Sequence, residues 1–161
     1  MKRVLPILAI IAMALFGSRS LLAQNDPFLG VWKLNPAKCK YVNAPPAPRS
    51  ETRTVEAVGK SIKITLDGVN LDGSHIGYSY TTNFDGEQVP IVGENRFFGE
   101  NMISMTRVDA YTFTAQTKKG DVVLRDVRGV VSKDGKVTTL TAKGHDDQGR
   151  PATAITVWEK Q

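Results

Sequence analysis

The chain has 161 residues, and its 21 Lys and Arg residues exceed its 16 Asp and Glu residues, which gives a formal charge of +5 at pH 7. Three of the cations lie in the first 23 residues, which hold no acidic residue, so the rest of the chain carries a net charge of only +2. Because this charge is small and spread along the chain, it gives little attraction to nucleic acid or to an anionic membrane, and we expect no nucleic-acid partner.

The N-terminal segment has the succession that is typical of a secretory signal peptide. Two basic residues precede the apolar run 4–16, and the small residue at a cleavage site would be Ala23, before Gln24. The run is shorter than the roughly 20 residues that a membrane-spanning helix needs, which favours a cleaved signal over an anchor. We expect 1–23 to be a signal peptide and 24–161 a single domain that is periplasmic or secreted, with no stable membrane insertion.

A domain of that length buries roughly two thirds of its unfolded surface and needs no disulfide to be stable. Its one cysteine, Cys39, has no partner within the chain. Such a thiol is either a small buried hydrophobe or an exposed group that pairs with a second molecule. We favour the first, because no neighbouring His is present to activate the thiol.

The stretch FLGVWKLNPAKCK, residues 28–40, predicts the opening strand of a closed barrel. Alternate residues of a strand share a face, so Gly30, Trp32 and Leu34 point the same way. The glycine leaves room for the Trp32 ring to close a narrow barrel end, and Asn35-Pro36 then ends the strand. An ordinary amphipathic strand with a core Trp gives the same pattern.

Beyond residue 50 the sequence alternates with a period of two, and no stretch of ten residues has convincing helical periodicity. Turn residues such as Gly59-Lys60, Asp85-Gly86 and Asp134-Gly135 join consecutive strands into an antiparallel meander. A meander of this size hides its edges by closing, so the last strand should pair with the first. The fold class is therefore all-β, a single antiparallel meander barrel of 8–10 strands. The expected later strands are 51–58, 61–67, 75–84, 102–108, 111–118, 121–132, 136–144 and 152–160, with a short irregular one near 88–92.

Several motifs carry a resemblance to a known family. GVWKLNPAKCKY, the proline-rich stretch after it and VVSKDGKVTTLTAKG resemble the lipocalin-like domain proteins that bacteria secrete, within the lipocalin and fatty-acid-binding superfamily. The resemblance covers nearly all of 24–161, although members often have Ser where Cys39 stands. It implies a barrel with an apolar cavity, and this branch has no generally established ligand or activity.

The proline-rich stretch 41–50 excludes both a helix and a central strand. It therefore connects strands, either as a cover over an open barrel end or as a plain connector. A fatty-acid-binding protein would have two helices here, so the chain departs from that branch.

Alternation also predicts which side chains point into the barrel. Ile62, Ile64 and Leu66 share a face, as do Ile76, Tyr78, Tyr80, Thr82 and Phe84, and likewise Tyr111, Phe113 and Ala115. Strand 102–108 is ambiguous between the face with Ile103, Met105 and Arg107 and the opposite face. A tyrosine inside a barrel offers apolar area with one hydrogen-bonding group, which orients a ligand, although aromatics also serve to fill a small barrel.

Strand 121–132 places a charge on either face, so Arg125 or an Asp126–Arg128 pair approaches the interior. The resemblance implies that an Arg of a late strand lies over the opening Trp, and Arg125 and Arg128 are the candidates. A ligand carboxylate would also satisfy a buried guanidinium.

The loop 93–99 holds Phe97 and Phe98 between two glycines. Adjacent residues of a strand cannot both face the core, so we expect the loop to form part of a portal at the open end. A β-bulge with both rings packed on a neighbouring loop is the alternative.

Chemical motifs are few. The two histidines, His75 and His145, belong to no recognised catalytic motif, and His145-Asp146-Asp147 is more typical of a solvated turn than of a metal site. We expect no catalytic residue, metal or cofactor, and a barrel that binds a small apolar or amphipathic molecule rather than an enzyme. A filled barrel that acts through its outer surface is the alternative, and an enzyme that uses the cavity is a third. The cavity candidates are Trp32, Tyr78, Tyr80, Phe84, Phe97, Phe98, Tyr111, Phe113, Arg125 and Arg128.

The N-terminal pattern makes a testable prediction. When the full chain is expressed in a bacterium with a functional secretion system, the exported protein should begin near Gln24, because the signal is cleaved after small residues. The intact mass of the exported form measures this. A protein that keeps residues 1–23 and stays in the membrane fraction would contradict both the cleavage and the localisation.

Overall fold

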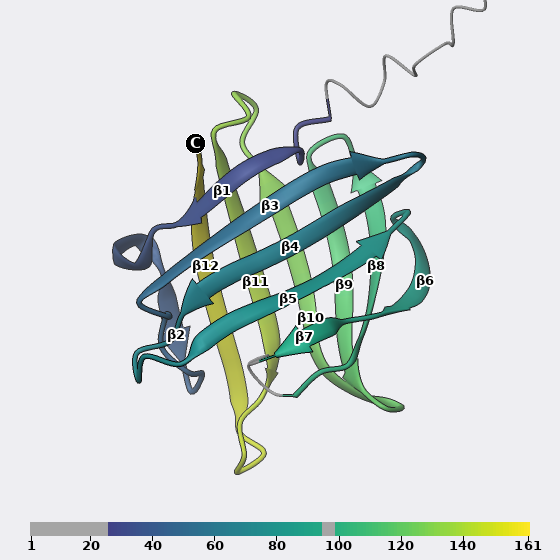
Figure 1. Ribbon diagram of the computed structural model, residues 1–161. Coiled ribbons are helices and arrows are strands. Elements are labelled where there is room, and N and C mark those ends of the chain that lie inside the picture. Colours follow the sequence, from purple (N-terminus) through teal and green to yellow (C-terminus); the bar gives the residue numbers. More distant parts are fainter. Residues whose placement is uncertain (1–25, 95–98) are drawn as a thin grey trace, which may run out of the picture.

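Twelve antiparallel strands form one sheet in the computed structural model, which describes residues 26–94 and 99–161 (Figure 1). The described helical structure is one short 3-10 turn, η1 (Pro36–Lys38). The strands are β1 (Gly30–Leu34), β2 (Lys40–Val42), β3 (Ser50–Val58), β4 (Ser61–Val69), β5 (His75–Thr82), β6 (Asp85–Pro90), β7 (Val92–Glu94), β8 (Met102–Asp109), β9 (Thr112–Lys119), β10 (Val122–Val131), β11 (Val137–His145) and β12 (Pro151–Lys160).

The sheet curls into a nearly closed barrel. Eleven strands follow one path, β6-β8-β9-β10-β11-β12-β1-β3-β4-β5-β7, and β2 pairs with β12 off that path. The predicted pairing of the last strand with the first is confirmed, with Leu34 opposite Trp158. The all-β antiparallel barrel is therefore confirmed. The strand count exceeds the prediction because the irregular region near 88–92 forms two short strands and because β2 adds a third.

The corner between β5 and β6 lies at a different residue than the sequence suggested. Asp85-Gly86 was expected to form the turn, but both residues belong to β6, whose pairing with β8 shifts register after Asp85. The chain changes direction at Phe84, which has a φ of +58°. The Phe84 amide donates to Thr82 Oγ1 at 3.2 Å. This corner swings β6 away from β5 and over to β8 (Figure 1).

One end of the barrel is filled by aromatic side chains. Trp32 is only 2% exposed, and its indole N–H donates to the carbonyl oxygen of Phe28 at 3.0 Å. The rings of Phe28, Phe84 and Phe113 pack together with centroids 5.4–5.8 Å apart. The prediction that Trp32 and Leu34 share the inward face is confirmed, because both are buried.

The cations over these rings come from residues that the sequence did not single out. Lys160 Nζ lies 5.1 Å from the centroid of the Trp32 ring, so the expectation that Arg125 or Arg128 covers this ring is wrong. Gly30 makes room for the lysine, because a Cβ there would lie 2.7 Å from Lys160 Cε. Lys160 can reach the ring because it sits directly opposite Trp32 in the β1–β12 ladder.

A second cation, Arg107, packs at the same end of the barrel. Its guanidinium lies 4.7 Å from the Phe28 ring centroid and 4.5 Å from that of Phe84. The same group forms a 2.6 Å ion pair with Asp26, whose side chain is mostly buried. Arg107 thereby ties the turn before β1 to the inward face of β8.

The inward faces follow the predicted alternation in most strands. Ile62, Ile64 and Leu66 are buried, as are Ile76 and Thr82. For the two ambiguous strands, β8 turns Ile103 and Met105 inward, and β10 turns Val131 and Gly129 inward. Gly129 leaves space for the neighbouring Phe113 ring, because a Cβ there would lie 2.2 Å from that ring.

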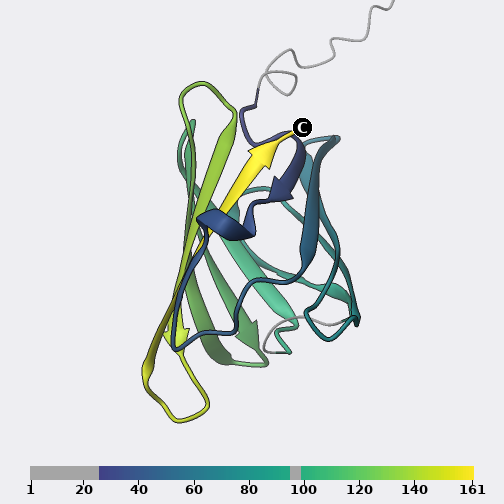
Figure 2. The same ribbon diagram turned by 90° about the vertical axis from the view of Figure 1, so that its left-hand side faces the viewer.

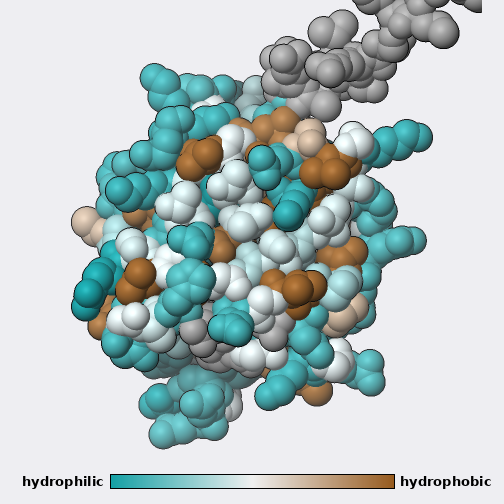
Figure 3. All heavy atoms as spheres, viewed as in Figure 1, coloured by the Kyte–Doolittle hydropathy of each residue, from teal (hydrophilic) through white to brown (hydrophobic). Residues whose placement is uncertain are grey.

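Several large apolar side chains are exposed outside the barrel on separate elements. Val42, Leu71, Val92 and Val122 lie on different strands and turns. The view in Figure 3 shows separate apolar spots among hydrophilic residues. Scattered exposure of this kind is ordinary for a folded protein. Within the described ranges, no helix has the length and hydropathy needed to cross a membrane.

The burial of Trp32 predicts a large loss of stability on truncation. Trp32→Ala should lower the free energy of unfolding by about 3–5 kcal/mol, the cost of removing a large buried aromatic. Chemical denaturation measures the change, and Val31→Ala on the outward face of the same strand is the control. A loss below about 1 kcal/mol for Trp32→Ala would show that the ring does not hold the barrel end together.

Candidate functional site

A cavity of about 150 Å³ lies inside the barrel, beyond the aromatic core around Trp32. This is roughly ten times the space that one buried water needs. Part of its wall is apolar, from side chains that belong to strands on all sides of the barrel. They include Leu34, Met105, Phe113, Leu140 and Trp158. Small residues such as Ala142 and Ala154 leave the space open, because no longer side chain projects from those positions.

The proline-rich connection forms part of the cavity wall. Ala44, Pro45 and Pro48 line the cavity, and Pro48 is buried. Figure 2 shows this connection running across one side of the barrel between η1 and β3. Of the two alternatives left open by the sequence, the structure favours a cover over the cavity rather than a plain connector.

The remaining wall carries two carboxylates and two guanidinium groups. Glu51 and Arg53 alternate on β3 and share the inward face with buried Val55. Arg125 projects from β10 and forms an ion pair with Glu100, which precedes β8. Glu51 is 4% exposed and Glu100 is 2% exposed, so both carboxyl groups are removed from bulk water.

Arg53 forms the boundary between the cavity and the aromatic core. Its guanidinium carbon lies 4.2 Å from the centroid of the Trp158 ring, a cation–π contact. Its buried Nε has no hydrogen-bond partner within residues 26–94 and 99–161. Buried polar atoms of folded proteins are seldom left without a partner. The unpaired donor of Arg53 therefore marks the cavity as suited to a ligand that accepts a hydrogen bond.

Burial perturbs the titration of the groups around this cavity. It raises the pKa of Glu51 to about 7 from an ordinary value of 4.5, even though Arg53 and Arg125 favour the ionised form. Loss of hydration lowers the pKa of Arg125. Burial also raises the pKa of Tyr78 and of Tyr80, so both phenols stay neutral and able to donate a hydrogen bond near neutral pH.

The structure brings four of the predicted site residues together at the cavity: Tyr78, Tyr80, Phe113 and Arg125. Trp32 and Phe84 lie deeper, around a void of about 30 Å³ in the aromatic core. Phe97 and Phe98 lie outside the described residues, so the portal remains a prediction.

Two predicted cavity residues lie elsewhere. Tyr111 is 38% exposed, because β9 begins only at Thr112 and the inward alternation does not extend back to it. Arg128 is exposed and lines a shallow groove on the outside of the sheet, because β10 turns Arg125 and Gly129 inward instead. The expectation that these two side chains face the cavity is wrong.

Sequence reasoning missed Glu51, Arg53, Glu100 and Tyr41. A partial signal existed for the first two, since both share the parity of Val55 in strand 51–58. The other face of that strand also holds both polar and apolar residues (Thr52, Thr54, Glu56 and Val58), so alternation did not identify the inward face. No local signal identified Glu100, which reaches Arg125 from a distant segment.

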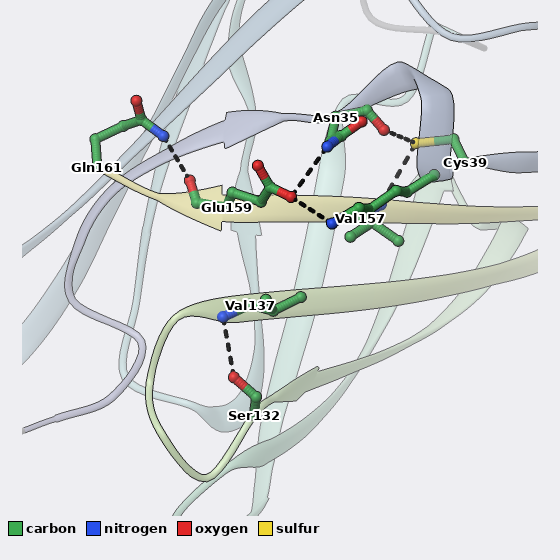
Figure 4. Close-up of polar contacts among 8 residues, drawn as sticks. Asn35, Cys39, Ser132, Val137, Val157, Glu159 and Gln161 are labelled. Atoms are coloured by element: carbon green, nitrogen blue, oxygen red, sulfur yellow. Dashed lines mark hydrogen bonds and ion pairs between the residues drawn. The ribbon is translucent and has the colours of Figure 1, made fainter.

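Of the remaining candidate groups, His145 lines the cavity, whereas His75 and Cys39 lie apart from it. His75 Nε2 contacts Asp67 Oδ2 at 2.9 Å on the surface, and no group of three or more metal-ligating side chains occurs in the described part of the chain. Cys39 is half-buried. Its thiol donates to the carbonyl oxygen of Asn35 at 3.3 Å and accepts from the Val157 amide at 3.4 Å, tying η1 to β12 (Figure 4).

No family model and no curated protein matches the sequence. Among solved structures, the barrel is similar to lobster apocrustacyanin A1, with a TM-score of 0.46 and 12% identity over 88% of this chain and 64% of that chain. It is also similar to apocrustacyanin C2, with a TM-score of 0.44 and 13% identity over 84% of this chain and 62% of that chain.

A third similar structure is the siderocalin Ex-FABP, described as functioning through dual ligand specificities. Its TM-score is 0.42, with 6% identity over 84% of this chain and 71% of that chain. The chain spans less than two thirds of the length of the two apocrustacyanin chains. At such identities the likeness concerns the fold alone.

The burial of Glu51 predicts a pH dependence of stability. The folded state holds this proton more tightly than the unfolded chain does, so the free energy of unfolding should fall as pH rises from about 4.5 to about 7. The shift corresponds to a loss of up to about 3 kcal/mol. Denaturant titrations across this range should show a smaller fall for Glu51→Gln than for the wild type.

Glu56→Gln, on the exposed face of the same strand, is the matched control and should keep the pH dependence of the wild type. Identical pH profiles for Glu51→Gln and the wild type would show that the Glu51 carboxyl is not desolvated in solution.

Proposed function

We propose that this protein is an exported binding protein whose barrel holds a small amphipathic molecule in the cavity beside Glu51 and Arg53. The main support for this proposal is the contrast in packing between the two halves of the barrel. The half around Trp32 is packed with aromatic side chains, whereas the other half encloses about 150 Å³. A barrel that served only as a scaffold would gain stability from filling that space, because unfilled interior volume is costly.

The chemistry of the cavity wall supports a ligand with two unlike ends. Apolar side chains such as Leu140 and Met105 form one part of the wall, and the charged cluster with Tyr78 and Tyr80 forms another. Burying a charged cluster costs stability unless the charges are well compensated, so a cluster kept beside an open cavity is consistent with use in binding. Binding sites for small molecules combine apolar walls with a few placed polar groups in this way.

The size of the cavity limits the ligand. A volume of about 150 Å³ suits a molecule of on the order of ten non-hydrogen atoms rather than a large pigment. Export is supported by the N-terminal pattern of basic, apolar and small residues. A binding protein delivered to the periplasm or the medium would meet such small molecules directly.

A cavity-filling variant tests the proposal. Octanol, octanoate and 1-octanesulfonate should be titrated into the protein by calorimetry, and at least one should bind with 1:1 stoichiometry. Ala142→Phe, which projects a ring into the cavity, should weaken that binding by about tenfold or more, because the ring occupies the ligand's space.

Thr141→Phe is the control, because Thr141 belongs to the same strand but lines the groove on the outer face. Saturable binding that survives Ala142→Phe unchanged would place the ligand outside the cavity. Absence of binding by all three compounds would overturn the proposal of a binding barrel for small amphipathic molecules.

A further inference from the structure

The charges that line the cavity do not balance when Glu51 carries a proton. Arg125 has its counter-charge in Glu100, with which it forms an ion pair. Arg53 forms no ion pair within the described residues, and its nearest acid along the strand is Glu51. With Glu51 ionised, the four groups are neutral in sum. With Glu51 protonated, the cavity holds one positive charge in excess.

The surroundings of Glu51 favour the protonated form to an unusual degree. The groups that face it are Tyr41 from β2, Arg53 from β3, Tyr78 and Tyr80 from β5, and Arg125 from β10. Two further titratable residues, Glu100 and His145, line the same cavity. Desolvation outweighs the pull of both arginines and raises the pKa of Glu51 to about 7. A carboxyl group in this state changes its protonation when a nearby charge is added.

We propose that the cavity binds a small organic anion, such as a carboxylate or a sulfonate on a short apolar chain, against Arg53, and that Glu51 takes up one proton as the anion enters. This inference rests on the proposed function and adds the ligand's charge and a coupling to pH. The bound anion supplies the counter-charge that the protonated Glu51 no longer provides. The proton comes from solvent, and the cavity returns to neutrality.

The geometry supplies hydrogen-bond donors for such an anion. The buried Arg53 Nε lacks a partner among the described residues, and the Tyr41 hydroxyl, beside the Cys39 thiol, lines the same cavity. Hydrogen bonds from a guanidinium to an oxyanion are among the strong ones in proteins. The apolar chain of the ligand would lie along Leu140 and Met105. A cationic ligand would instead meet an excess positive charge, and an alcohol would leave that charge uncompensated.

Binding of the anion without proton uptake by Glu51 is energetically unfavourable. If an anion entered while Glu51 stayed ionised, the cavity would hold one negative charge in excess with little water to screen it, which is unfavourable. Binding and protonation must therefore be linked. By linkage, the affinity for an anion should be constant while Glu51 is already protonated and should fall about tenfold per pH unit once the free protein has lost that proton.

The experiment compares three ligands of one chain length across pH. 1-Octanesulfonate, which stays ionised throughout, should bind the wild type at least tenfold more tightly than octanol at pH 6. Between pH 7 and pH 9 its affinity should fall by about fiftyfold, whereas that of octanol should change little. Octylamine should bind more weakly than octanol at pH 6, where the cavity carries the excess positive charge.

Two variants separate the roles of the residues. Glu51→Gln should bind 1-octanesulfonate with an affinity that no longer depends on pH, because the amide cannot exchange the proton. Arg53→Gln should lose at least tenfold in affinity for the sulfonate at pH 6 while it keeps its affinity for octanol. Arg128→Gln, on the outer face, should behave as the wild type does.

Proton uptake can be measured directly. Calorimetry at pH 8 in two buffers of different ionisation enthalpy should show close to one proton taken up per sulfonate bound by the wild type and none by Glu51→Gln. Octanol that binds as tightly as the sulfonate, or a wild-type affinity without pH dependence, would overturn this inference while leaving the binding barrel intact. Loss of all binding would instead overturn the proposed function.

Discussion

The pairing of β12 with β1 is the constraint on which the rest of the structure depends. It joins the two ends of the sequence and turns an open meander into a barrel with an interior. It also places Trp158 beside Leu34 and Lys160 beside Trp32, so the closing ladder delivers side chains to both halves of the interior. A sheet of this width without closure would expose two long edges.

Closure of the barrel produces an interior whose two halves affect stability in opposite ways. In one half, Phe28, Phe84 and Phe113 fill the space, and Arg107 covers two of these rings while bonding to Asp26. Burial of apolar area is the stabilising term there. In the other half the space stays open, and polar groups are held away from water at a cost. The stacked Arg53 and Trp158 pair stands at the boundary and contacts both halves.

This arrangement explains why the protonation of Glu51 responds strongly to a charge in the cavity. The packed aromatic half excludes water from one end of the cavity, and Pro45 and Pro48 of the proline-rich connection form part of its wall. Charges in such a site interact more strongly than on a surface because less solvent screens them. A single added charge is therefore enough to shift the protonation of Glu51, whereas the same charge near exposed Glu56 would have little effect.

The sequence by itself determined the all-β barrel, the inward faces of several strands and the buried position of Trp32. These features follow from local rules: two-residue alternation, turn chemistry and the need to hide sheet edges. It did not determine the inward face of β3, β8 or β10, because those strands carry apolar and polar side chains on both faces. Only the tertiary structure decided that Arg125 faces the cavity and Arg128 the outside, since β10 must place Gly129 under the Phe113 ring. It alone brought Glu100 to Arg125 and set Glu51 and Arg53 beside an unfilled space, because these contacts join segments whose separation in the chain no local pattern encodes.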